Sequence, residues 1–100
     1  MKTKIKSVYD GFPKTKKTPK KNEIWLAYFP YYGRTNIEKL RPVLICSVID
    51  DEAMVRKITT NSKRGVFINI NGDKKSYLTK HYARIKLYKC YRKLDKYEKN

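Results

Sequence analysis

The sequence predicts a mainly β protein that folds as a small β-barrel or sandwich. Short runs of aromatic and β-branched residues recur along the chain, and turn-forming residues separate them. The dipeptide Asn71-Gly72 follows one of these runs and is the strongest hairpin signal in the sequence. Apolar residues at helical spacing are few, so we expect little helix.

The first strand is expected at residues 22–30, which read NEIWLAYFP. Aromatic and branched side chains between Asn22 and Pro30 are typical of a strand that is buried on both faces. The polar residues 31–40 follow as a loop, with Gly33 as its breaker. Loops of this length in compact domains often carry function.

The second strand is expected at residues 41–49, which read RPVLICSVI. Proline cannot donate a hydrogen bond to a neighbouring strand, so it stands at a strand's start or on an edge. Pro42 therefore predicts the start of this strand, with Arg41 at the junction between loop and sheet. Because a residue before proline is held extended, the Arg41 side chain should project from a defined backbone. The alternative role for Arg41 is a surface salt bridge with Glu38.

The rest of the domain is expected to continue as strands and turns. Residues 50–52 predict an acidic turn, and residues 53–60, AMVRKITT, predict a third strand. Residues 61–65 predict a basic turn, and residues 66–70, VFINI, a fourth strand. Residues 74–88 predict one or two strands, although their pattern also fits a helix. In the basic tail that follows we expect at most one short helix.

The N-terminal residues 1–21 differ in composition from the rest. They hold eight lysines, one aspartate, two prolines and little periodicity. This composition predicts a flexible basic arm, with the domain itself in residues 22–100. The arm is expected either to hold phosphates or to remain a solvated tail.

The charge balance indicates an anionic partner. The chain has 100 residues, enough for one domain, and its 25 Lys and Arg against 9 Asp and Glu give a net charge of +16. Such an imbalance attracts polyanions, of which nucleic acid is the commonest. An acidic protein or an anionic membrane surface satisfies the same physics.

Two cysteines and one histidine limit the chemistry. Cys46 and Cys90 are too few for a disulfide framework, and His81 alone adds no metal cluster, so we expect reduced thiols. No apolar run approaches the roughly 18 residues of a membrane span. The basic N-terminus lacks the apolar core of a secretory signal, so a cytoplasmic location is expected.

The remaining Arg, Lys, Thr, Ser and Tyr residues suit phosphate chemistry that takes its nucleophile from the substrate. RNA supplies one, because a 2′-hydroxyl lies beside each phosphodiester. An arginine matches phosphate geometry and keeps its charge, and a hydroxyl can hold a non-bridging oxygen. Arg41 and Thr59 are candidates, because consecutive predicted strands could bring them together at one end of the sheet.

Four segments resemble one known family. NEIWLAYFP, RPVLIC, VRKITT and KKSYLTKHYARIKLYKC follow one another at a spacing similar to that of the MazF/PemK (Kid) toxins of bacterial type II toxin–antitoxin systems. The resemblance covers roughly residues 22–90. Asn22-Glu23 replaces the usual Gly-Asp of the family, and the segment between Ile70 and Lys74 is shorter than in most members.

The resemblance implies a compact SH3-like β-barrel that forms a homodimer. It implies sequence-selective cleavage of single-stranded RNA, usually mRNA, without a metal or other cofactor, leaving a 2′,3′-cyclic phosphate and a 5′-hydroxyl. It gives Arg41 a proton-donating or phosphate-stabilising role and Thr59 the role of orienting the phosphate. A cognate acidic antitoxin would cover the basic RNA groove.

Further RNA contacts are expected from loops and turns around these two residues. Tyr31 and Tyr32 are expected either to stack on bases or to pack against the barrel. The candidate RNA-binding residues are Arg34, Lys39, Thr60, Lys63, Arg64 and Ser76.

Two other functions remain open from the sequence. A basic module on the same barrel would bind RNA, DNA or a protein without cleaving it. A basic structural protein, such as a ribosome-associated factor, is the third reading.

Overall fold

The structure is a computed structural model that describes residues 3–5, 15–30, 37–70 and 75–96. In chain order its elements are β1 (Thr3–Ile5), β2 (Glu23–Pro30), β3 (Ile37–Ile49), β4 (Glu52–Thr59), the 3-10 turn η1 (Ser62–Arg64), β5 (Val66–Ile68), β6 (Ser76–Lys86), the 3-10 turn η2 (Leu87–Lys89) and β7 (Cys90–Lys96). The prediction of a mainly β fold with little helix is confirmed.

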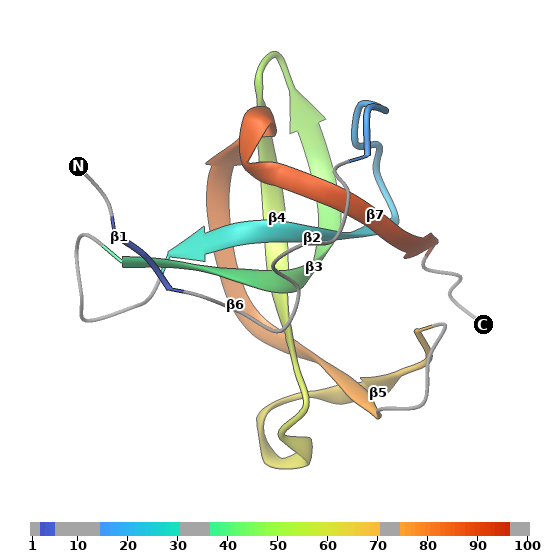
Figure 1. The fold of residues 1–100 in the computed structure, drawn as a ribbon. Helices are drawn as coiled ribbons and strands as arrows, with labels where there is room; N and C mark the ends of the chain where they lie inside the picture. The colour runs from blue at the N-terminus through green and yellow to red at the C-terminus, as the bar shows by residue number, and fades with distance from the viewer. Residues whose placement is uncertain (1–2, 6–14, 31–36, 71–74, 97–100) are drawn as a thin grey trace.

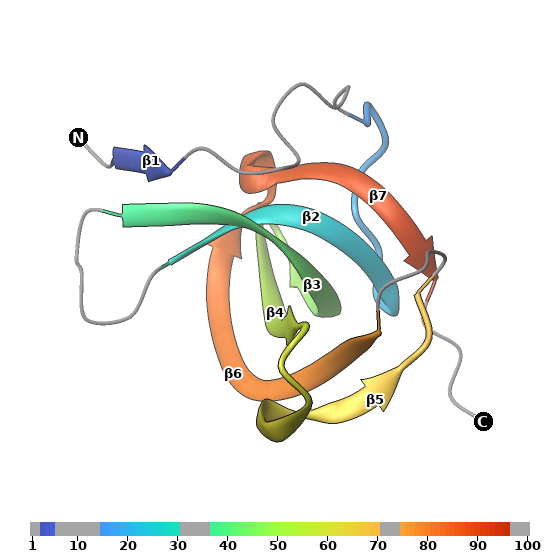
Figure 2. The same ribbon diagram turned by 60° about the horizontal axis from the view of Figure 1, so that its bottom comes forward.

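The strands form one sheet that curls into a half-barrel (Figures 1 and 2). Along the sheet the order is β5-β6-β4-β3-β2-β7, and all neighbours in this order are antiparallel. β1 pairs in parallel with the beginning of β3. β2 therefore has β3 on one side and β7 on the other.

β2 is buried on both faces, as its sequence predicted. Ile24, Trp25, Leu26 and Ala27 are all fully buried. Successive strand residues point to opposite faces of a sheet, so this run contributes to packing on both sides.

Two core clusters result, and alternation along β2 and β3 places them on opposite faces of the sheet. Each is built from strands far apart in sequence. The first core cluster comprises Trp25, Ala27, Phe29, Val43, Ile45, Ala53, Val55, Ile85 and Cys90, and the second comprises Ile24, Leu44, Ile58, Ile68 and Leu78.

β3 is longer than the sequence predicted. It begins at Ile37, so Arg41 and Pro42 lie inside the strand and not at its start. The reason is that β2 pairs with the whole polar segment before Pro42, from Pro30↔Glu38 to Ala27↔Arg41. Pro42 still has an edge position on its other side, because pairing with β4 begins one residue later, at Val43↔Lys57.

The C-terminal part of the domain is also more regular than expected. β6 is one continuous strand of 11 residues, and the alternative of a helix in this segment is wrong. The tail forms β7, where at most a short helix was expected. β2 supplies the reason, because its edge away from β3 pairs with β7 from Glu23↔Lys96 to Ala27↔Cys90.

The described part of the N-terminal arm lies against the sheet. The main-chain N–H of Thr15 donates to the carbonyl of Tyr91 over 2.8 Å, and the Thr15 hydroxyl accepts from the N–H of Lys93 over 3.0 Å. β1 adds a second contact through its pairing with β3. The sequence had predicted no packed element among these residues.

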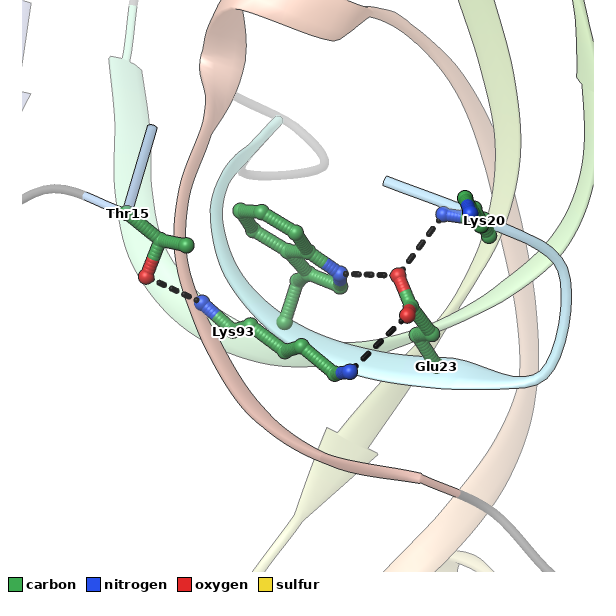
Figure 3. A network of polar contacts seen from close by, with 5 residues as sticks. Thr15, Lys20, Glu23 and Lys93 are labelled. Carbon is green, nitrogen blue, oxygen red and sulfur yellow. Dashed lines mark hydrogen bonds and ion pairs between the residues drawn. The ribbon is translucent and has the colours of Figure 1, made fainter. Parts of the chain in front are cut away.

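A carboxylate joins this segment to β2 and β7 (Figure 3). Glu23 Oε1 accepts hydrogen bonds from Trp25 Nε1 at 3.0 Å and from the N–H of Lys20 at 2.8 Å. Glu23 Oε2 pairs with Lys93 Nζ at 3.0 Å. Glu23 thus satisfies the indole N–H of the largest core side chain while fixing the entry into β2.

Candidate functional site

A basic pocket of about 250 Å³ opens at the end of the first core cluster. Its lining consists of Phe29, Pro30, Lys39, Arg41, Lys57, Arg64 and His81. Among the residues that the structure describes, none of those lining the pocket carries a carboxylate. The site therefore concentrates positive charge over a partly apolar floor.

β2 and β3 build the floor and one wall. Lys39 and Arg41 are two residues apart on β3, so both point to the same face. Phe29 is directly opposite Lys39, and Ala27 is directly opposite Arg41. Phe29 belongs to the first core cluster and is 2% exposed, so the pocket rests on packed core.

β4 contributes Lys57 to the same face. Lys57 is directly opposite Val43, the next residue after Arg41 on that face of β3. Pairing between the two strands ends there, which opens the sheet beside Lys57. The pocket therefore forms where the ladder between β3 and β4 stops.

A β-bulge brings His81 to the pocket. The register between β4 and β6 shifts from Arg56↔Tyr82 to Ile58↔Leu78. Thr79, Lys80 and His81 thus stand opposite Lys57 alone. Bulges re-aim side chains and are frequent beside functional sites.

A buried threonine holds this bulge. Thr79 is 1% exposed, and its hydroxyl donates to the carbonyl of Lys57 at 2.8 Å and accepts from the N–H of His81 at 3.1 Å. The Thr79 carbonyl accepts from Arg56 Nε at 2.9 Å. Through its one hydroxyl, Thr79 fixes the backbone of two residues that line the pocket.

The turn η1 supplies Arg64. Asn61 begins the turn, accepting from the N–H of Lys63 at 3.0 Å through Oδ1 and from the N–H of Arg64 at 3.1 Å through its carbonyl. Gly65 then packs directly on β6, since a Cβ at this position would lie 2.4 Å from the carbonyl oxygen of Leu78. Only glycine lets the chain approach so closely.

The electrostatics of the pocket favour an anion. Burial lowers the pKa of Lys57, and the nearby charges of Arg41, Arg64 and Lys39 lower it further. Neighbouring cations repel one another, so each charged side chain is less stable in the free pocket. An anion that binds among them relieves this repulsion. The pocket therefore suits a group with several anionic oxygens, such as a phosphate.

Three of the residues proposed from sequence meet in this pocket, namely Lys39, Arg41 and Arg64. Glu38, considered as a partner of Arg41, is buried and forms an ion pair with Lys89.

Thr59 is the last residue of β4 and is not among the lining residues. Its hydroxyl accepts from the N–H of Asn61 at 3.2 Å. Thr60 and Lys63 are exposed in the following turn, and Ser76 begins β6 opposite Ile68.

Three predicted contacts, Arg34, Tyr31 and Tyr32, lie outside the described residues.

Sequence reasoning missed Lys57, Thr79 and His81 as site residues. Lys57 offered a signal, because it lies two residues before Thr59 in the predicted third strand. Alternation therefore places its side chain on the same face as that of Thr59. His81 and Thr79 offered none, because the bulge that places them depends on pairing between distant strands.

The described residues contain no group of three or more His, Cys, Asp or Glu side chains arranged to hold a metal ion. Nor do they contain a helix with the length and apolarity needed to cross a membrane.

No protein-family model, curated protein or solved structure matches the chain.

Proposed function

We propose that the protein is an endoribonuclease that cleaves single-stranded RNA at the basic pocket. The observation that carries the proposal is the convergence of Lys39, Arg41, Lys57, Arg64 and His81 in one hollow. Cations directed at one point stabilise the charge that develops on a phosphoryl group during transfer. The net charge of +16 would draw the RNA backbone towards this site.

The reaction uses the 2′-hydroxyl of the RNA as its nucleophile. The 2′-oxygen attacks the phosphorus, the bond to the 5′-oxygen breaks, and the products are a 2′,3′-cyclic phosphate and a 5′-hydroxyl. One proton leaves the 2′-oxygen and one reaches the departing 5′-oxygen. The amine of Lys57 and the imidazole of His81 are the pocket groups suited to carry these protons.

Arg41 stabilises the phosphoryl oxygens in this scheme. A guanidinium keeps its charge at any working pH and presents a rigid fork to phosphate. Arg41 follows Lys39 by two residues on β3 and lines the same pocket, and in this proposal the scissile phosphate binds beside it. Thr59 stays a predicted catalytic residue, two positions after Lys57 on β4.

The resemblance to the MazF/PemK toxins supports the same reaction through the segment that carries Arg41. The proposal includes the SH3-like barrel, the homodimer and an acidic antitoxin that such a resemblance implies. An acidic segment of that antitoxin would compete with RNA for the same cations.

The test compares three proteins on a long single-stranded RNA in EDTA: wild type, Arg41→Gln, and Arg84→Gln. Arg84 is exposed on β6 and is not a lining residue, so its variant removes the same charge elsewhere. We expect discrete cuts ending in cyclic phosphate. Arg41→Gln should slow cutting by at least about 100-fold, as for loss of an oxyanion-stabilising group, and Arg84→Gln should not.

Two results would contradict the proposal. Salt-sensitive binding of RNA that stays intact would make the protein a binding module without catalysis. Equal cutting by wild type and Arg41→Gln would place the activity elsewhere.

A further inference from the structure

A row of side chains leads away from the basic pocket across three strands. Tyr77 on β6 is directly opposite Thr59 of β4 on one side and Phe67 of β5 on the other. Directly opposite residues share a face of the sheet. Thr59, Tyr77 and Phe67 therefore form one continuous row.

This row lies on the same face as the pocket residue Lys57. Lys57 and Thr59 are two positions apart on β4, so alternation directs both to one face, about 7 Å apart along the strand. Two strand spacings, about 10 Å, then separate Thr59 from Phe67. Figures 1 and 2 show η1, which carries Arg64, beside β5 at this end of the sheet.

The row ends in an aromatic pair of which Phe67 is exposed to solvent and Tyr77 is half-buried. The rings of Phe67 and Tyr77 lie 5.9 Å apart at 67°, an edge-to-face arrangement. Phe67 is 56% exposed although it is a large apolar side chain. Such a ring on the same face of the sheet as a cluster of cations matches a ligand that alternates phosphates with flat, apolar faces.

We propose that Phe67 and Tyr77, the aromatic pair, form a stacking seat for a nucleobase of the RNA whose phosphate occupies the basic pocket. Single-stranded nucleic acid is held in this way elsewhere, by cations on the backbone and aromatic rings under the bases. The inference rests on the proposed function for the identity of the ligand, but it does not require cleavage.

The position of the pair favours RNA over a protein partner. β5 has only three residues, a short edge for pairing with another chain. The turn η1, which carries Arg64, directly precedes β5, and Lys57 shares the face of the row through Thr59, so cations that select an anionic ligand lie on the same side of the sheet as the seat. A nucleotide next to the bound phosphate reaches the seat by following the row through Thr59.

The test measures binding of a single-stranded RNA with 2′-fluoro groups, which has no hydroxyl to attack. We compare wild type, Phe67→Leu, Phe67→Tyr and Val66→Ala by fluorescence anisotropy. Val66 is the matched control, because it is 71% exposed on the same strand and points to the opposite face. The same oligonucleotide carries 2-aminopurine at successive positions to report stacking.

We expect Phe67→Leu to weaken binding by about 5-fold or more, the range for loss of base stacking on one ring. Its dependence on salt should stay that of wild type, because no phosphate contact is removed. Quenching of 2-aminopurine at one position should disappear in Phe67→Leu. Phe67→Tyr and Val66→Ala should behave as wild type.

Unchanged affinity and quenching in Phe67→Leu would overturn the inference and leave cleavage at the basic pocket intact. Loss of self-association in Phe67→Leu, seen by sedimentation with RNA affinity unchanged, would assign the pair to a protein contact instead. A protein that binds no RNA would overturn both proposals. Stacking at Phe67 in a protein that never cuts RNA would support the seat and overturn the nuclease.

Discussion

The hydroxyl of Thr79 donates a hydrogen bond to the carbonyl of Lys57 at 2.8 Å across the bulge between β4 and β6. The same hydroxyl accepts from the N–H of His81, so one buried side chain sets the positions of two residues that line the basic pocket. Bulge geometry and pocket geometry are therefore coupled through Thr79.

Thr79→Val removes the hydroxyl and keeps the shape of the side chain. It leaves the carbonyl of Lys57 and the N–H of His81 without this partner, so we expect a loss of about 1–3 kcal/mol in the free energy of unfolding. Cleavage of RNA should fall as well. Urea unfolding and RNA cleavage measure the two effects, and Thr79→Ser, which keeps the hydroxyl, should restore most of both. Equal losses in both variants would show that the methyl group matters and the hydroxyl does not.

Lys57→Met should stabilise the free protein at low ionic strength by about 0.5–1 kcal/mol, because it removes a partly buried charge that is also repelled by Arg41, Arg64 and Lys39. The folded-state pKa of Lys57 lies below its ordinary value, so the protonated amine disfavours the fold at every pH below that pKa. This penalty fades as pH rises from the lowered pKa to the ordinary one, and the advantage of Lys57→Met should fade with it. Thermal unfolding against pH tests this, with Lys80→Met as the control for loss of charge outside the pocket. A larger gain from Lys80→Met would contradict the prediction.

Binding of RNA should add a proton to Lys57. An anionic phosphate raises the pKa of Lys57 back towards its ordinary value, so protons are taken up when the pH lies between the two. RNA affinity should accordingly fall as pH rises through the lowered pKa. Calorimetry in buffers of different ionisation enthalpy detects the uptake, which should vanish in Lys57→Met. Proton uptake that persists in this variant would assign it to another group.

Gly65→Ala should separate η1 and β5 from β6. The added Cβ would lie 2.4 Å from the carbonyl oxygen of Leu78, which is backbone and cannot rotate away. Overpacking of this kind costs about 1–3 kcal/mol, and the shift would carry Arg64 away from the pocket. Urea unfolding and RNA affinity report the two effects. Ser62→Ala, an exposed change in the same turn, is the control. Wild-type stability in Gly65→Ala would contradict the prediction, because it would mean that β5 can move away from β6 without a cost in the free energy of unfolding.

Glu23→Ala should destabilise the fold by about 1–3 kcal/mol, because it leaves the indole N–H of Trp25 without its acceptor. Partial burial raises the pKa of Glu23, but hydrogen bonds from Trp25, Lys93 and Lys20 and the charge of Lys93 outweigh it, so the pKa is lowered. The stabilisation is therefore complete above the ordinary pKa and is lost as pH falls through the lowered one. Thermal unfolding between neutral and acid pH should show this loss in wild type and not in Glu23→Ala. Asp51→Ala, at an exposed pair with Lys86, should match wild type.

Local pattern predicted most of the strands but not where distant strands pair. The buried run of β2 could be read directly, because aromatic and branched residues fill consecutive positions. The start of β3 could not, because its polar residues from Ile37 onward become a strand only through pairing with β2. The tail became β7 for the same reason, since β2 offers it an open edge.

The candidate site shows the same division. Arg41 was predicted from its own neighbours, and the structure brings Lys39 and Arg64 to it. His81 was not, because the three residues of β6 opposite Lys57 are set by register and not by composition. Thr59 lies two residues beyond the last pair of the β3–β4 ladder, Val43↔Lys57, and is not among the lining residues, so its convergence with Arg41 stays a prediction.

The pairing of β7 with β2 determines when the sheet can be completed during synthesis and folding. β2 is translated before the rest of the antiparallel sheet, yet its second neighbour is translated last. Until β7 emerges from the ribosome, one edge of β2 has no partner, and Trp25 and Ala27 lack Cys90 from their core. Contacts between such distant segments form slowly. The sheet, and with it the floor under Arg41, is therefore completed only after synthesis of β7. The candidate site accordingly forms late in folding.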